Sequence, residues 1–155
     1  MRLVHYSSKP FVFDSGRVYK QRDHHKPVGL WVSVQGEDDW PSWCDSEQWG
    51  LDALIHASEL ELAPSAKILI VDTLEKLDDF HNTHNKGGEA FWESRNIHWD
   101  KLISSYDGII IAPYRWERRL EYMWYYGWDC ASGVIWNLDC VSQVTALNLD
   151  VIESK

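Results

Sequence analysis

The stretch Trp124–Leu138, which reads WYYGWDCASGVIWNL, constrains the fold more than any other part of the sequence. It places aromatic residues beside a glycine, an acid, a thiol and a hydroxyl, and it then runs into a short apolar strand. The chain has 10 tryptophans, and each indole presents a large flat face with a single N–H donor. Such a stretch is consistent with a wall that holds a flat ligand, and equally with a heavily packed corner of the core.

The length and composition of the chain favour one folded domain over residues 1–155. A chain of 155 residues is long enough to bury a substantial core. Apolar residues make up 45% and charged residues 25% of the sequence, which is ordinary for a soluble globular protein. We find no internal repeat, linker or low-complexity segment that would divide the chain into smaller units.

The charge and the cysteines argue against several classes of function. A formal net charge of −9 is unsuited to sequence-independent binding of DNA or RNA, which requires a cationic face. No apolar run approaches the roughly 18 residues of a membrane-spanning helix, and the first residues lack the apolar core of a signal peptide. The three cysteines, Cys44, Cys130 and Cys140, lack metal-ligand spacing. We therefore expect reduced thiols in a cytoplasmic protein that does not associate with membranes.

Short apolar segments separated by irregular gaps predict the secondary structure. Strands are expected where apolar residues alternate or run together, and helices where they recur at helical spacing. The expected strands are Arg2–Tyr6, Val28–Val34, Leu60–Leu62, Lys67–Val71, Gly108–Ala112, Gly133–Leu138 and Val144–Ile152, and the expected helices are Ser42–Ala57, Thr73–His84, Trp99–Ser105 and Arg115–Trp124. The gaps are too short for repeated parallel crossovers, which favours an α+β fold over an α/β fold.

Polar residues in and before the second expected helix bear on its start and on metal binding. Asp72 and Glu75 have the spacing of a capping box, in which the two side chains satisfy free N–H groups of the first turn. His81 and His84 lie three residues apart, but a catalytic zinc requires three protein ligands. We therefore interpret both imidazoles as surface groups and predict no metal site.

Polar and aromatic residues on separate expected strands form the best candidate site. His5 lies in the first strand, as LVHYS, and Trp31 and Ser33 lie in the second, as GLWVS. Asp129 and Ser132 come just before a late strand. Folding can bring such groups to one ligand, where the imidazole would bond a ribose hydroxyl and the indole would stack on a flat ring. The acid would stabilise positive charge that develops at the sugar carbon.

The same two segments resemble the ADP-ribosyltransferase superfamily. That family carries a histidine in its first strand, and LVHYS resembles this strand, with His5 in the histidine position. Its second strand often reads Gly, apolar, aromatic, apolar and then a small residue. VGLWVS resembles it, with Trp31 where a tyrosine is usual and Ser33 in the small position. The family commonly has a glutamate entering a late strand, where this chain has Asp129 and Ser132 instead.

The resemblance implies a fold of two small antiparallel sheets that form a cleft and are flanked by helices. NAD would bind in this cleft as the substrate, with its nicotinamide stacked near Trp31. ADP-ribose would then be transferred to a macromolecular acceptor, either a protein or a nucleic acid. The residues implied to bind NAD are His5, Tyr6, Trp31, Ser33 and Arg22, and those implied to act in catalysis are Asp129 and Ser132.

The pyrophosphate of NAD requires cations, which are scarce in so acidic a chain. Arg17, Arg22 and Lys26 lie between the two motif strands and are the first candidates. The three arginines at 115–119 form a second basic cluster, which we interpret as a solvated helix face paired with neighbouring glutamates.

A second function is also consistent with the sequence. A non-catalytic binding or inhibitor protein would use exposed tryptophans as anchors and its acidic residues to attract a basic partner. The two functions differ in one geometric expectation. A transferase requires His5, Trp31 and one of Asp129 or Ser132 to face a common cleft.

Overall fold

A computed structural model describes residues 1–22 and 24–148 as a mixed structure of helices and strands. Seven strands form a hydrogen-bonded sheet in the order β4-β5-β6-β2-β1-β3-β7. The strands are β1 Leu3–Ser7, β2 Leu30–Val34, β3 His56–Leu62, β4 Ile68–Val71, β5 Gly108–Ile111, β6 Ser132–Ile135 and β7 Val141–Leu147. Most neighbours are antiparallel, but β4 and β5 are parallel.

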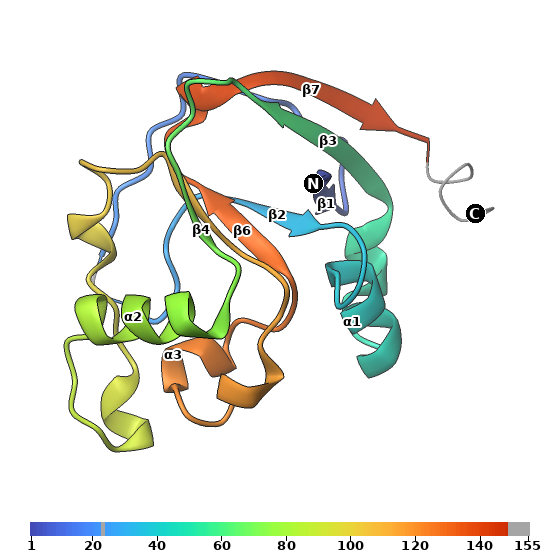
Figure 1. Cartoon of the computed structure of the whole chain (residues 1–155). Helices are drawn as coiled ribbons and strands as arrows, with labels where there is room; N and C mark the ends of the chain where they lie inside the picture. The colour runs from blue at the N-terminus through green and yellow to red at the C-terminus, as the bar shows by residue number, and fades with distance from the viewer. Residues whose placement is uncertain (23, 149–155) are drawn as a thin grey trace.

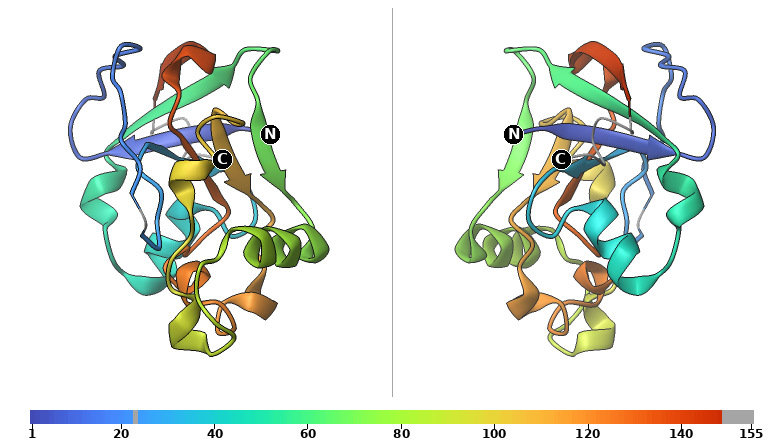
Figure 2. Two further views of the ribbon diagram at one scale, coloured as in Figure 1. Left: turned by 90° about the vertical axis from the view of Figure 1, so that its left-hand side faces the viewer. Right: turned by 90° about the vertical axis from the view of Figure 1, so that its right-hand side faces the viewer.

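The three α-helices of the described residues lie at one end of the sheet (Figures 1 and 2). The α-helix α1 lies on the side of β1 and β2, whereas α2 and α3 lie towards β4 and β6 (Figure 1). The helical segments are α1 Trp40–Glu47, α2 Leu74–His84 and α3 Met123–Tyr126, with the short 3-10 helices η1 Leu51–Leu54, η2 Phe91–Ser94, η3 Trp99–Lys101, η4 Trp116–Arg118 and η5 Leu138–Cys140. Among the described residues, no helix has the length and apolar character needed to cross a membrane.

The sheet differs from the expected pair of small antiparallel sheets. The described strands are connected into a single sheet, and the parallel β4–β5 pair is joined through a crossover that contains α2. The pairing between β1 and β2 is nevertheless short, since it consists only of the residue pairs Leu3–Val34 and Val4–Ser33 among the described residues. By comparison, β1 pairs with β3 over five residues. The sheet is therefore continuous but is joined at its centre by a short seam.

Two apolar clusters cover the two faces of the sheet. One contains Trp99, Trp124 and Trp128 packed against strands β5 and β6. The other cluster contains Leu3 and Leu30 together with buried residues of β3, β5 and β6. Trp124, Tyr125 and Trp128 are fully buried, so the stretch Trp124–Leu138 is largely a packed corner of the core. Trp128 and the turn that follows it also line a cleft.

The expected helix Ser42–Ala57 is wrong in its second half. Asp39 caps α1 by accepting a hydrogen bond from the backbone N–H of Ser42. Gln48 then adopts a left-handed conformation with φ 51°, which ends the helix. The chain continues through η1 and enters β3 at His56, so residues expected to be helical belong to a strand.

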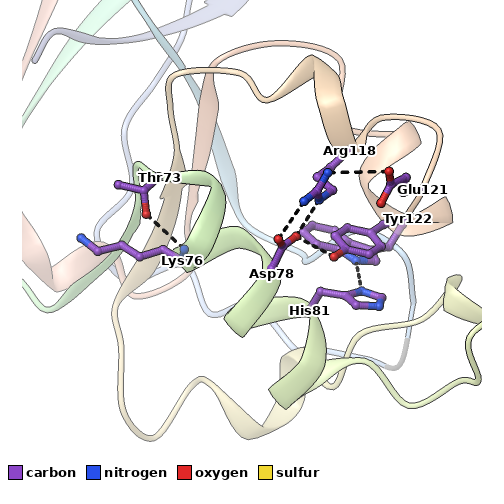
Figure 3. Close-up of polar contacts among 8 residues, drawn as sticks. Thr73, Lys76, Asp78, His81, Arg118, Glu121 and Tyr122 are labelled. Carbon is purple, nitrogen blue, oxygen red and sulfur yellow. Dashed lines mark hydrogen bonds and ion pairs between the residues drawn. The ribbon is translucent and has the colours of Figure 1, made fainter.

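Most other expected elements are confirmed with shifted ends. The helix Thr73–His84 is present as α2, but Thr73 rather than Asp72 is its N-cap, because the Thr73 hydroxyl accepts from the backbone N–H of Lys76 (Figure 3). Asp72 instead pairs with the ammonium of Lys76. The expected Trp99–Ser105 and Arg115–Trp124 helices shorten to 3-10 turns, with α3 beginning at Met123. The last strand ends at Leu147, and positions 149–152 of its expected range lie outside the described residues.

Candidate functional site

A cleft of about 480 Å³ opens beside the seam of the sheet. Three separate parts of the chain line it, namely β1, the segment from Lys26 to η1, and the turn 127–132. Six of the seven residues predicted to form the site line this cleft. They are His5, Tyr6, Trp31, Ser33, Asp129 and Ser132.

The seventh predicted residue, Arg22, does not line the cleft. Its side chain is exposed in the loop before β2. Of the three cations predicted between the motif strands, Lys26 lines the cleft, whereas Arg17 and Arg22 do not. The Lys26 ammonium lies 5.8 Å from the centre of the Trp31 ring. A Cβ at Gly127 would lie 3.3 Å from the Lys26 side chain, so the glycine makes room for that chain to cross the turn. Local sequence does not encode this long-range contact.

His5 occupies the place where β1 and β2 diverge. Its Nδ1 lies 2.8 Å from the backbone oxygen of Trp31, so Nδ1 must carry a proton and donate it. Burial lowers the pKa of His5 below its ordinary value, although the bond to Trp31 opposes this shift. The imidazole is therefore neutral at pH 7, and its Nε2 is an acceptor for a hydroxyl donor.

The hydroxyls of the site are held by internal hydrogen bonds. The Ser33 oxygen accepts from the backbone N–H of Trp40, which ties β2 to the start of α1. The Ser132 hydroxyl donates to the backbone oxygen of Cys130. Tyr6 accepts from the side chain of Gln35. Each hydroxyl can still bond a ligand: those of Ser33 and Tyr6 keep their O–H donor, and the oxygen of Ser132 keeps its acceptor lone pairs.

Asp129 is the acid of the cleft. One of its carboxylate oxygens lies 3.2 Å from a guanidinium nitrogen of Arg119, and both side chains are largely buried. Burial raises the pKa of Asp129 above its ordinary value, while the charges of Arg119 and Lys26 oppose the rise and Glu47 adds to it. A buried carboxylate whose pKa is raised by desolvation and opposed by nearby cations is common at functional sites.

Arg119 is fixed by aromatic rings and by the anchoring of its own segment. Its guanidinium lies 4.9 Å from the centre of the Tyr126 ring and also donates to the Tyr114 hydroxyl. The preceding residue, Arg118, forms a two-pronged ion pair with Asp78 of α2, at 2.8 and 3.0 Å. The basic cluster at 115–119 is thus engaged with α2 and the cleft, whereas the expected solvated face is represented only by the pair between Arg118 and Glu121.

The ion pair of Arg118 belongs to a larger contact between α2 and the segment before α3 (Figure 3). The Tyr122 hydroxyl also donates to Asp78, at 2.6 Å. The Tyr122 ring stacks on His81 with 3.7 Å between ring centres, and the indole N–H of Trp124 donates to His81. This network explains His81 without a metal. Among the described residues, no group of three or more His, Cys, Asp or Glu side chains is placed to hold a metal ion.

Four further tryptophans line the cleft and were not predicted as site residues. Trp128 packs against Trp31, with 4.8 Å between ring centres. Its indole Nε1 is buried and has no hydrogen-bond partner among the described residues. Trp40, Trp43 and Trp49 form the opposite wall. In sequence, Trp43 and Trp49 have the spacing of the apolar face of a helix, which gives no sign of a binding site.

Cys130 also lines the cleft, but it is not suited to act as a nucleophile. Burial raises the pKa of its thiol to about 12. The reactive thiolate form is therefore scarce near pH 7.

No protein-family model, curated protein or solved structure matches the chain. The case for a function therefore comes from the cleft and its chemistry.

Proposed function

We propose that the cleft binds NAD and that the protein transfers ADP-ribose from NAD to a macromolecular acceptor. The observation that carries the proposal is the convergence of His5, Trp31 and Asp129 on one cleft from distant parts of the sequence. The volume of about 480 Å³ falls within the range of small-molecule sites, about 300–1,000 Å³.

Each group of the cleft has a role in this reaction. The neutral His5 accepts a hydrogen bond from a ribose hydroxyl at Nε2. Trp31 stacks on the nicotinamide ring. Lys26 takes the place predicted for Arg22 and neutralises a phosphate.

Asp129 acts on the bond that breaks. The bond between the ribose C1′ and the nicotinamide nitrogen opens, and its electron pair leaves with neutral nicotinamide. Positive charge develops on the ribose, where the Asp129 carboxylate stabilises it and Ser132 orients the 2′-hydroxyl. A nucleophile of the acceptor then bonds to C1′ and releases its proton to water.

The test is NAD binding and nicotinamide release by the wild-type protein and by Asp129→Asn, with cell extract as the source of acceptors. We expect the variant to bind NAD within a few-fold of wild type and to release nicotinamide roughly 100-fold more slowly, because the charge stabilisation is lost but the shape is kept. Asp139→Asn is the matched control, since Asp139 is exposed in η5 and does not line the cleft. Equal rates in both variants would remove Asp129 from the mechanism.

A second candidate is a non-catalytic protein that binds a basic partner. It is favoured by the absence of a glutamate before β6 and by the engagement of Asp129 with Arg119. This candidate predicts neither NAD binding nor nicotinamide release with any extract, and capture of a basic protein instead.

A further inference from the structure

The wall of the cleft formed by α1 and η1 is made of tryptophans that pack on one another. The rings of Trp40 and Trp43 are parallel, with 5.2 Å between their centres and 7° between their planes. Trp49 meets both of them edge-on, at 6.0 and 5.6 Å. Trp49 is 60% exposed, so the wall presents indole surface both to the cleft and to solvent.

The chain segment that carries this indole wall (Trp40, Trp43 and Trp49) contains acidic residues and no lysine or arginine. Between Lys26 and Lys67 the sequence has no lysine or arginine. The same stretch contains eight acids, which are Glu37, Asp38, Asp39, Asp45, Glu47, Asp52, Glu59 and Glu61. Asp45, Glu47 and Asp52 lie on α1 and η1, are exposed, and form no ion pair with any described residue. Glu47 is also close enough to Asp129 for its charge to raise the pKa of that acid.

We propose that the indole wall binds an arginine side chain of a basic protein segment and so presents that segment to the cleft. A guanidinium stacks flat on an indole face and forms paired hydrogen bonds with a carboxylate. The segment from Trp40 to Leu54 carries both kinds of group, three indoles and three exposed carboxylates. The compact ammonium of lysine gains less from the same surface, because it cannot stack or form a two-pronged bond.

The charge of the wall also decides between classes of acceptor. A nucleic acid would bring its phosphates against Asp45, Glu47 and Asp52, and no cation of the wall would compensate for the repulsion. An acceptor that binds this wall is therefore a protein, and the residue that the wall recognises is an arginine. The identification of the bound protein as the acceptor of ADP-ribose rests on the proposed function. The binding of the arginine does not, because it requires no NAD.

The experiment measures binding of short peptides to the full chain without NAD, by calorimetry at low and moderate salt. The probes are a glycine-spaced arginine peptide and matched peptides with lysine or with uncharged citrulline. We expect the arginine peptide to bind several-fold more tightly than the lysine peptide, the citrulline peptide not to bind, and binding to weaken as salt rises. Equal binding of arginine and citrulline peptides, or preferential binding of single-stranded RNA, would overturn the proposal.

Variants locate the binding site. Trp49→Ala should weaken binding of the arginine peptide by about fivefold or more, as expected for the loss of one cation–π contact, and Glu47→Gln should weaken it less. The controls are Trp92→Ala and Glu75→Gln, because Trp92 is 73% exposed in η2 and Glu75 is exposed in α2, both outside the cleft. Loss of binding in the controls equal to that in Trp49→Ala would contradict the assignment.

A parallel assay separates this inference from the proposed function. If the arginine peptide binds the indole wall but no nicotinamide is released from NAD, the docking site stands and the transferase proposal fails. If nicotinamide is released and Trp49→Ala leaves peptide binding unchanged, the transferase proposal stands and the docking site fails.

Discussion

At the scale of single residues, burial of the Asp129 carboxylate disfavours its charged form. Its carboxylate is desolvated, and its pKa is raised even though Arg119 lies 3.2 Å away. A raised pKa means that the folded state favours the protonated acid. The stabilisation from this group is therefore fully present below the ordinary Asp pKa of about 3.9 and is lost as the pH rises through the raised value.

The first prediction concerns the stability of Asp129→Asn. The amide keeps the shape of the side chain and removes the buried charge, so at pH 7 we expect the free energy of unfolding to stay the same or to rise by up to about 1 kcal/mol. Urea denaturation from pH 4 to pH 8 measures this, and the variant should have the flatter profile. A loss of more than 1 kcal/mol at pH 7 would mean that the ion pair with Arg119 outweighs desolvation.

Site residues that lie in or next to an easily recognised strand could be predicted from the sequence. His5, Trp31 and Asp129 each stand at or beside a strand with a clear apolar pattern, and pairing of those strands brings the three together. Arg22 was misplaced because the direction of a loop side chain depends on contacts far away in sequence. Lys26, which was also among the predicted cations, does line the cleft, and its side chain lies beside Gly127.

At the scale of elements, the contact between α2 and the segment before α3 holds the acid of the cleft in place. Asp78 accepts hydrogen bonds from both Arg118 and Tyr122, and the next residue after Arg118 is the one that pairs with Asp129. The network in Figure 3 is thus connected through the chain to the candidate site.

The second prediction tests that connection with Arg118→Lys. Lysine keeps the charge but loses the two-pronged bond to Asp78, so we expect a loss of about 1–3 kcal/mol in the free energy of unfolding. If NAD turnover is present, it should fall as well, because Arg119 is less well positioned. Glu121→Gln is the matched control, since Glu121 is exposed and lies 3.6 Å from Arg118. An equal loss in the control would argue against a special role for the Asp78 pair.

The elements themselves were predictable to different degrees. Gly108–Ala112 was expected as a buried strand and is β5, because an unbroken apolar run has few alternatives. The end of α1 was not predictable, since it depends on a left-handed Gln48, a residue type that seldom marks a helix end. Thr73, and not the expected Asp72, caps α2. Both residue types are good N-caps, so the sequence does not show which of the two adjacent side chains reaches the free N–H groups.

At the scale of the whole molecule, five histidines respond to pH in the same direction. Burial is the main cause that lowers the pKa of each, and for His25 the value falls to about 4. The others are His5, His24, His81 and His84. Because the unfolded chain takes up protons first, the stability contributed by these groups is present above pH 6.5 and is lost as the pH falls towards their lowered values.

The lowered pKa values of these histidines make the stability of the protein depend on pH. Between pH 7 and pH 5 we expect the free energy of unfolding to fall by about 1–3 kcal/mol, less than the sum over all five because several rings are partly exposed. Urea denaturation followed by tryptophan fluorescence measures the change, and His25→Gln should reduce it. A profile that stays level over this range would mean that these imidazoles titrate alike in the folded and unfolded chain.

The position of β6 in the sheet has a consequence for how the protein is made. This strand, Ser132–Ile135, lies between β5 and β2 and is the element that joins the β4–β5 pair to the rest of the sheet. A nascent chain that stops before it has two strand groups with no shared neighbour, and the apolar faces of both remain open to water. The seven-stranded sheet therefore cannot form until β6 has been synthesised, and until then these apolar strand faces are open to aggregation.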